Sequence, residues 1–351
     1  MYYNIDGIET SEYSDAVFFI YKSEEDKLYE CSYQGDRIMY SINDVIIDLY
    51  DLIAQYVFGD LKAYYEIIPN LLIWNEAAGH SAEWDGSVDE YNGLVRRIRG
   101  KIVFEKYMML VDLQGLLGSI QNLITAINSD FMNFYIQLTT IGEDRPSFET
   151  GTTWTSGYHC SIVFSLLTSY FTKAHSILDI LTKLVHEFDK DPGTYSGLEK
   201  LRSKGILFGD RKWLSMDKVS DTVFDASKKN CVYEIESLRN ELVHNGTWEA
   251  LEKVYIETQK GRIVKRFIFW PDFRENRLAV SGNRNKFFSS GKTVNEELLR
   301  IHIDLLKRLE YTLNYIKHHF AESMPNRSFE EIMKMNISEA KQQIQSYYHQ
   351  A

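Results

Sequence analysis

The sequence predicts an all-α fold: a helical bundle with a small β-hairpin insertion and an N-terminal helical region. Apolar residues recur at steps of three and four along several long stretches, which is the period of one face of an α-helix. Strand-like composition is confined to two short runs within about 254–270. The hydrophobic content of 44% in 351 residues is enough for a large core and is ordinary for a globular protein.

The chain divides into three predicted regions. Residues 1–142 are an N-terminal helical region of unknown role, in which Ser41 can cap a helix. The apolar residues that follow it have helical spacing: Ile42, Val45, Ile46, Leu49 and Ile53. The polar run 141–157 is the predicted linker. Residues 155–325 form a second helical domain, and residues 326–351 a C-terminal helix.

The second domain opens with a long predicted helix that ends before Asp191. Its apolar stripe comprises Val163, Leu167, Tyr170, Ala174, Ile177, Leu181, Leu184 and Phe188. A helix over roughly 224–244 follows, and Asn245-Gly246 ends it because Gly readily adopts a positive φ. Its stripe comprises Cys231, Ile235, Leu238 and Leu242.

A hairpin and a last helix complete this domain. Residues 254–258 and 262–270, joined by 259–261, have the composition of two paired strands. The last helix begins at Thr293, with Glu296 three residues later in a capping box. Its stripe comprises Leu299, Leu306, Leu309, Leu313, Ile316 and Phe320.

Charge is unevenly distributed along the chain. The net charge is −11, but residues 1–95 carry 19 Asp/Glu and 4 Lys/Arg, a net of −15, so the remainder is +4. We therefore expect no broad coating of nucleic acid, and any polyanion site in the second part. The acidic part is interpreted mainly as solvated surface. A further hypothesis is that it lies against the basic part and keeps an enzyme inactive.

The sequence favours a cytoplasmic protein that does not span a membrane. The N-terminus lacks the basic region and apolar core of a secretory signal. The uncharged stretch 113–129 is interrupted by four amide side chains and would be a poor membrane span. Three cysteines far apart, Cys31, Cys160 and Cys231, predict a reducing compartment and no zinc site. P-loop, dinucleotide-fingerprint, HExxH and CxxC motifs are absent from the sequence, so we expect no metal and no cofactor.

The segment 237–246 groups three polar candidates at a predicted helix end. Asn240 and His244 are four residues apart and share a helix face, with Arg239 at the edge of the apolar stripe. Arg is a planar phosphate ligand, and His transfers protons near neutral pH. These residues are therefore candidates for RNA cleavage by the 2′-hydroxyl without a metal. By spacing alone, an Arg and a His that only form caps and surface ion pairs are the commoner explanation.

The box RNELVHNG, which starts at Arg239, resembles the signature of the HEPN superfamily: Arg, a polar residue that is often Asn, and His after four to six residues. The long upstream helix YHCSIVFSLLTSYFTKAHSILDILTKLVHEF, the insert KGILFGDRKWL and the following Trp248 also fit. The resemblance covers about 155–325. It gives Arg239 the family's arginine position, Asn240 its polar position and His244 its histidine position.

The resemblance implies a HEPN-type helical bundle that forms a homodimer. Many HEPN proteins are metal-independent endoribonucleases whose two Arg/His signatures meet across the dimer. Many act in toxin–antitoxin or anti-phage systems, so an antitoxin or another regulator protein is an expected partner beside RNA. One subgroup carries a modified Tyr two residues after the histidine, but this chain has Gly246 there. Two alternatives stay open: a non-catalytic HEPN module that binds nucleic acid or protein, and a scaffold in which the box only caps a helix.

Basic residues decorate the predicted hairpin: Lys260, Arg262, Lys265 and Arg266, interleaved with Phe267, Phe269 and Trp270. This pattern predicts a contact with the RNA backbone through charge and stacking. The alternative is a hairpin whose positive charges only prevent edge-to-edge aggregation.

Overall fold

The computed structural model describes residues 2–10, 18–23, 29–58, 61–67, 87–89, 92–93, 96, 102–142, 150–189, 205–227, 230–249, 251–284, 286–323 and 342. The chain forms two compact units. The first comprises Met1–Asn43, Ile120–Asp179 and Met216–Thr312, and the second Asp44–Ser119, Ile180–Ser215 and Leu313–Ala351. Of the C-terminal helix predicted at 326–351, only Gln342 is among the described residues.

The prediction of an all-α bundle is wrong. With 61% of its residues in helices and 17% in strands, the fold is mixed α and β. Antiparallel sheets of four, three and two strands occur among the described residues. Two of these sheets include segments that we assigned to a helical region or to a linker.

The four-stranded sheet lies at the start of the predicted N-terminal helical region. It has the order β2-β1-β3-β4, with β1 at Tyr2–Tyr3, β2 at Glu9–Thr10, β3 at Phe18–Lys22 and β4 at Tyr29–Tyr33. In β3, Phe18 and Ile20 are buried while their neighbours are not, which is the alternation of a half-buried strand. Strands of two and five residues offer too few positions for this period to be recognised from the sequence.

Helix α1 (Gly35–Phe58) begins six residues before the predicted cap. The Asp36 carboxylate accepts a hydrogen bond from the Tyr33 N–H at 3.2 Å where the helix starts. Ser41 therefore lies inside the helix, and its hydroxyl donates to Glu310. The predicted apolar face is confirmed, because all of its residues are buried: Ile42, Val45, Ile46, Leu49 and Ile53.

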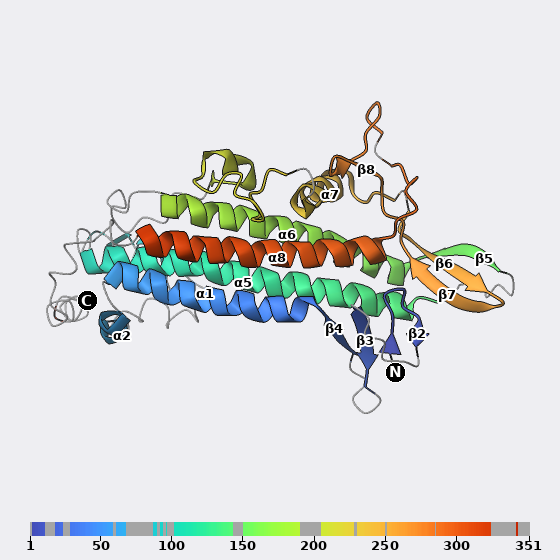
Figure 1. Ribbon diagram of the computed structural model, residues 1–351, viewed down its shortest axis with the longest axis horizontal. Helices are drawn as coiled ribbons and strands as arrows, with labels where there is room; N and C mark the ends of the chain where they lie inside the picture. Colours follow the sequence, from blue (N-terminus) through green and yellow to red (C-terminus); the bar gives the residue numbers. More distant parts are fainter. Residues whose placement is uncertain are drawn as a thin grey trace. The chain divides into compact units, whose positions relative to one another are not determined.

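The other long helices are α5 (Ile102–Thr140), α6 (Tyr158–Asp189) and α8 (Val294–Ser323), and each contributes residues to both units (Figure 1). Short elements are α2 (Leu61–Ile67) and the 3₁₀ helix η4 (Phe208–Trp213). The predicted stripe of α6 is buried throughout, and that of α8 is buried except at Leu299. The capping box at Thr293 is not formed, because its buried hydroxyl oxygen has no partner among the described residues.

Helix α5 contains a stretch, Met109–Thr140, that is long and apolar enough to cross a membrane by length and composition alone. One face of this stretch is buried at helical spacing: Leu113, Leu117, Ile120, Ile124, Ile127 and Phe131. A buried face of this kind is typical of the core helix of a globular unit.

The three-stranded sheet has the order β5-β6-β7, with β5 at Gly151–Ser156, β6 at Lys253–Gln259 and β7 at Arg262–Phe267. The predicted hairpin is present as β6 and β7. Positive φ angles at Lys260 (51°) and Gly261 (76°) give the tight two-residue turn that suits the twist of paired strands. Strand β5 comes from the predicted linker 141–157, so that interpretation is wrong from Gly151 on.

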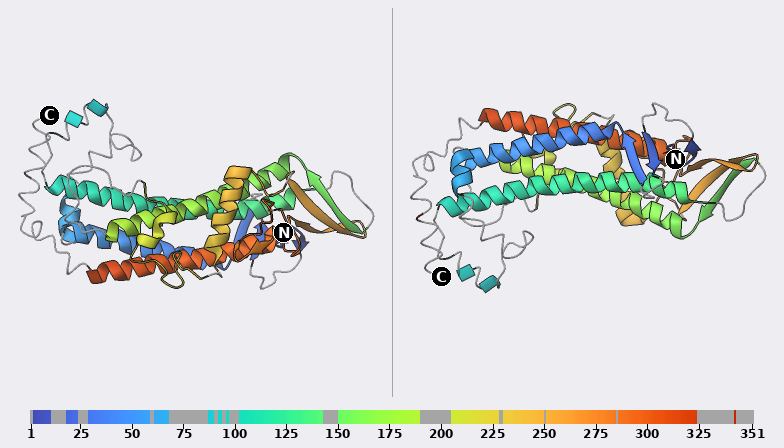
Figure 2. Two further views of the ribbon diagram at one scale, coloured as in Figure 1. Left: turned by 90° about the horizontal axis from the view of Figure 1, so that it is seen from above. Right: turned by 90° about the horizontal axis from the view of Figure 1, so that it is seen from below.

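In Figures 1 and 2 this sheet projects beyond the ends of α5, α6 and α8 that belong to the first unit. The shorter helix α7 (Cys231–Asn245) runs across the direction of α6 and α8 in Figure 2. A two-stranded ribbon, β8 (Phe273–Arg274) with β9 (Arg277–Leu278), follows β7, and the Leu278 N–H donates to Ser237 of α7 at 3.0 Å.

Candidate functional site

The candidate site lies on α7, which has a defined start and end. The Asn230 side chain caps the start by accepting a hydrogen bond from the Val232 N–H at 2.8 Å. Gly246 ends the helix with φ 86° and ψ −116°, a conformation that only Gly adopts without strain. The stripe predicted for this helix is confirmed, because Cys231, Ile235, Leu238 and Leu242 are all buried. The helix begins at Cys231 rather than near 224.

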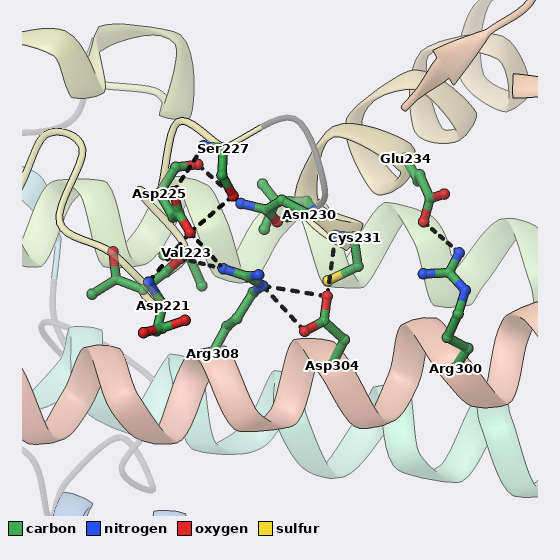
Figure 3. Close-up of polar contacts among 12 residues, drawn as sticks. Asp221, Val223, Asp225, Ser227, Asn230, Cys231, Glu234, Arg300, Asp304 and Arg308 are labelled. Carbon is green, nitrogen blue, oxygen red and sulfur yellow. Dashed lines mark hydrogen bonds and ion pairs between the residues drawn. The ribbon is translucent and has the colours of Figure 1, made fainter. Parts of the chain in front are cut away.

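Polar contacts with α8 fix the first turns of α7 (Figure 3). The Cys231 N–H donates to the Asp304 carboxylate at 3.2 Å. One turn on, Glu234 pairs with Arg300 at 2.6 Å, and Arg300 also pairs with Glu297 at 2.7 Å. Burial raises the pKa of Glu234 although the Arg300 charge opposes that effect. The helix is thus held to α8 by charged groups that are mostly removed from water.

The loop before α7 explains why the helix does not begin earlier. Arg308 of α8 pairs with Asp304 at 3.2 Å and with Asp225 of the loop at 3.4 Å, and donates to the Thr222 carbonyl at 3.2 Å. Burial alone would raise the pKa of Asp225, but hydrogen bonds from Ser227 and from the Asp221 N–H, with the Arg308 charge, lower it. Because these bonds favour the carboxylate and a turn, they hold the loop in a non-helical path (Figure 3).

The structure brings two of the three candidate residues into contact. The Nη1 of Arg239 donates to the Oδ1 of Asn240 at 3.0 Å. Asn240 and His244 are exposed, whereas Arg239 is half-buried at the edge of the apolar stripe, as the sequence indicated. The Nε of Arg239 is buried and has no hydrogen-bond acceptor among the described residues.

His244 stands apart from Arg239. Five residues of α-helix separate them, which corresponds to about 140° around the helix axis. By the same geometry Asn240 and Val243 lie between the two, and Val243 is 47% exposed. Among the described residues no group hydrogen-bonds the His244 imidazole, although the adjacent Asn245 amide donates to Glu241 at 2.8 Å. Within one chain, the arrangement can bind an anion at Arg239 or exchange a proton at His244.

The four basic residues of the hairpin are not equivalent. Lys260 and Arg262 are exposed at the turn, and no carboxylate of a described residue is in ion-pair contact with them. Lys265 is 25% exposed and lies 3.8 Å from Asp6 and 3.9 Å from Glu296. Its charge is therefore partly neutralised by the protein itself.

Arg266 has a structural environment. It faces Ile256 in the register of β6 and β7, on the buried side of the sheet. Its Nε donates to the Ile141 carbonyl at 2.6 Å, and its Nη1 donates to the Gly7 carbonyl. Burial lowers the pKa of this guanidinium. Arg266 thus ties the N-terminal turn and the end of α5 to β7, where a solvent-borne phosphate does not reach it.

Sequence reasoning missed two features of the first unit. Trp154 in β5 is 53% exposed beside Tyr255 of β6. The β-branched residues around it, TTWT, were the signal that could have predicted a strand. His302 of α8 is fully buried between the hydroxyls of Tyr33 and Tyr170. No local pattern marks a buried histidine.

No group of three or more His, Cys, Asp or Glu side chains that could hold a metal ion occurs in the part of the chain that the structure describes. Comparisons with models of protein families, with curated proteins and with solved structures find no match. The resemblance to the HEPN signature therefore remains a prediction from the residues of α7.

Proposed function

We propose that this chain is a metal-independent endoribonuclease of HEPN type that acts as a homodimer, with Arg239, Asn240 and His244 as its site. The observation that carries the proposal is the contact of Arg239 with Asn240 at 3.0 Å, one turn from an exposed His244. The Nε of Arg239 also lacks an acceptor among the described residues. An unsatisfied buried donor costs about 1–3 kcal/mol, which a ligand oxygen that reached the guanidinium would recover.

A second copy of the chain supplies what one α7 lacks. In a twofold dimer each contact occurs twice with the roles exchanged. Two antiparallel α7 helices, with the axis midway between positions 239 and 244, would place Arg239 of one protomer beside His244 of the partner subunit. Val243 lies in the same exposed sector, and this pairing would bury its apolar side chain.

The chemistry is a transesterification within RNA. The 2′-hydroxyl gives its proton to an imidazole, and its oxygen attacks the adjacent phosphorus. The 5′-oxygen of the next nucleotide leaves and takes up a proton, which the second imidazole of the dimer can supply. Arg239 binds the phosphate oxygens and stabilises their charge in the transition state, while Asn240 orients the guanidinium. The products end in a 2′,3′-cyclic phosphate and a 5′-hydroxyl.

The proposal includes the surroundings that such an enzyme would need. RNA is the substrate, and Lys260 and Arg262 at the hairpin turn are the exposed cations available for its backbone. An antitoxin or another regulator protein is the expected partner, because a nuclease active on cellular RNA must be held inactive. A role as a toxin or an anti-phage effector in the cytoplasm is part of the same proposal.

One observation favours the alternative, a non-catalytic module that binds nucleic acid or a protein. A general base is ordinarily oriented by a third group, whereas no described residue hydrogen-bonds the His244 imidazole. In the proposed dimer, the partner subunit would have to supply that contact. Without it, α7 would offer only a basic and polar binding surface.

The first experiment compares purified wild-type, Arg239→Ala and His244→Ala proteins on total RNA in the presence of EDTA. We expect cleavage by the wild type alone, with cyclic-phosphate and 5′-hydroxyl ends. Unchanged cleavage by His244→Ala, or loss of authentic wild-type activity in EDTA, would refute the mechanism. Binding of RNA without cleavage by any of the three proteins would favour the non-catalytic module.

A mixing experiment tests whether the site is shared between protomers. Arg239→Ala and His244→Ala are each inactive, but their heterodimer keeps one intact pair, Arg239 of one protomer with His244 of the partner subunit. After subunit exchange we expect about a quarter of the wild-type activity, because half of the dimers carry one of two sites. A mixture as inactive as its components would show that each site lies within a single chain.

A further inference from the structure

The sheet β5-β6-β7 has one face whose side chains form a row of aromatic rings. Antiparallel register places Trp154 opposite Tyr255 and Tyr255 opposite Phe267, so all three project from the same face. The opposite face carries Val254 and Ile256, which are fully buried. The aromatic row therefore lies on the outer side of the sheet.

The rings of this row differ in exposure. Trp154 is 53% exposed, Tyr255 is partly exposed, and Phe267 is buried. The Tyr255 and Phe267 rings are stacked with centroids 5.7 Å apart, and Phe269 packs edge-on against Tyr255 at 4.6 Å. The two phenylalanines thus hold Tyr255 rigidly, while Trp154 presents an open ring at the edge strand.

Cations surround the aromatic row. The Lys253 ammonium lies 4.9 Å from the centre of the Trp154 ring. In β7 the register with β6 shifts so that Val264 is an extra residue, and Lys265 faces Glu257 while Arg262 faces Gln259. This bulge turns Arg262 and Lys265 to the same face, although three residues would separate them onto opposite faces of a regular strand.

The acidic neighbours leave the exposed edge of this face positive. Lys265 is matched by Asp6 and Glu296, and Glu257 lies beside it. Lys253, Lys260 and Arg262 remain as the cations along the Trp154 edge and the turn. Open aromatic rings beside these cations suit a ligand with alternating flat bases and phosphates.

We propose that the outer face of β5-β6-β7 binds single-stranded RNA, with bases stacked on Trp154 and Tyr255 and phosphates on Lys253, Lys260 and Arg262. This rests on the proposed function, because it assigns the surface that captures the substrate strand. Bases within a duplex are stacked on one another and present no free ring face. The surface therefore selects unpaired RNA and gives the enzyme a substrate class.

Binding is measured separately from cleavage. The probe is a fluorescein-labelled, unstructured 2′-O-methyl RNA of twelve nucleotides, which cannot be cleaved because its 2′-oxygens are blocked. Fluorescence anisotropy with the full-length protein gives the dissociation constant. We expect Trp154→Ala and Tyr255→Ala each to weaken binding about tenfold, since a stacked base contributes about that much. Trp154→Phe should retain most of the affinity, because a flat ring remains.

The matched control is Trp213→Ala. Trp213 is 77% exposed and has a lysine, Lys212, 5.0 Å from its ring, but it belongs to the second unit and to no aromatic row. Its removal should leave the affinity unchanged. Lys260→Gln combined with Arg262→Gln should reduce the salt dependence of binding by one to two phosphate contacts, about 0.7 in the logarithmic slope for each.

Several outcomes would overturn the inference. These are wild-type affinity in Trp154→Ala, no binding of the probe by the wild type at low salt, and equally strong competition by duplex RNA or by inorganic polyphosphate. His244→Ala should bind the probe as the wild type does. Loss of cleavage with intact, Trp154-dependent binding, or the reverse, therefore tells a failure of one proposal from a failure of the other.

Discussion

The buried imidazole of His302 has two tyrosine partners. Its Nε2 lies 2.7 Å from the Tyr33 hydroxyl and its Nδ1 lies 3.1 Å from the Tyr170 hydroxyl. Tyr33 donates its own proton to Asn128, so it accepts the proton of Nε2, and Tyr170 donates to Nδ1. The ring also stacks on Phe131 with centroids 4.1 Å apart. Every polar atom of this imidazole is therefore satisfied only in its neutral form.

This network predicts a pH-dependent stability. Burial lowers the pKa of His302 to about 3, from an ordinary value of 6.5. The unfolded chain takes up the proton below pH 6.5 and the folded chain does not, so the stability contributed by His302 is complete above pH 6.5 and is lost as the pH falls toward 3. Relative to His302→Gln, the wild type should lose about 1.4 kcal/mol per pH unit in that window.

Denaturant unfolding at pH 7, 6, 5 and 4 measures the effect. His318→Gln is the control, because His318 lies on the exposed side of α8 and has no such network among the described residues. Parallel curves for the wild type and His302→Gln would show that His302 is protonated in the folded protein, and the predicted loss of stability would then be wrong.

At the scale of elements, α7 is positioned by α8 rather than by its own sequence. Its exposed sector carries the candidate site, and its first turns are fixed by Asp304 and Arg300. Arg308 completes this attachment by holding the preceding loop, with a side chain that is only 10% exposed. A change in these contacts would displace the whole helix and its candidate residues together.

We therefore expect Arg308→Met to lower the free energy of unfolding by about 3 kcal/mol, because it leaves Asp304 and Asp225 without their buried partner. Lys317→Met is the matched control. Lys317 pairs with Asp48 at 2.9 Å, but these side chains are 26% and 58% exposed, so the cost should stay below about 1 kcal/mol. Chemical denaturation measures both, and equal losses would contradict the assigned role of Arg308.

At the scale of the whole molecule, the N-terminal sheet belongs to the core of the first unit. Phe18 of β3 is 4% exposed and packs against Tyr135 of α5 at 4.4 Å and Phe131 at 5.8 Å. Tyr33 reaches His302 of α8. Removing residues 1–140 to test an inhibitory role of the acidic region would therefore remove part of this core, and point substitutions are the better test of that hypothesis.

Phe18→Ala should destabilise the protein by about 3–5 kcal/mol, the usual cost of deleting a buried ring. Phe19→Ala, on the opposite face of the same strand, should cost much less because Phe19 is only partly buried. Urea unfolding followed by circular dichroism compares the two. Similar small losses for both would indicate that the sheet is attached to the unit without contributing to its stability.

The sequence by itself determined the features that rest on neighbouring residues. The stripes of α6 and α8, the turn of the β6–β7 hairpin and the grouping of Arg239, Asn240 and His244 on the last turns of α7 all follow from local periodicity or turn chemistry. These are properties of a few consecutive residues, so no knowledge of the remaining chain is needed to recognise them.

The tertiary structure decided the rest, because strand pairing joins residues that the sequence keeps far apart. Thr153 of β5 meets Ile256 of β6 across 103 positions, and no local pattern announces such a partner. The bulge at Val264 likewise settles that Lys265 faces outward while Arg266 faces the core. The burial of His302 depends on groups from three different helices and strands. Long-range packing, and not propensity, made this chain a mixed α and β protein.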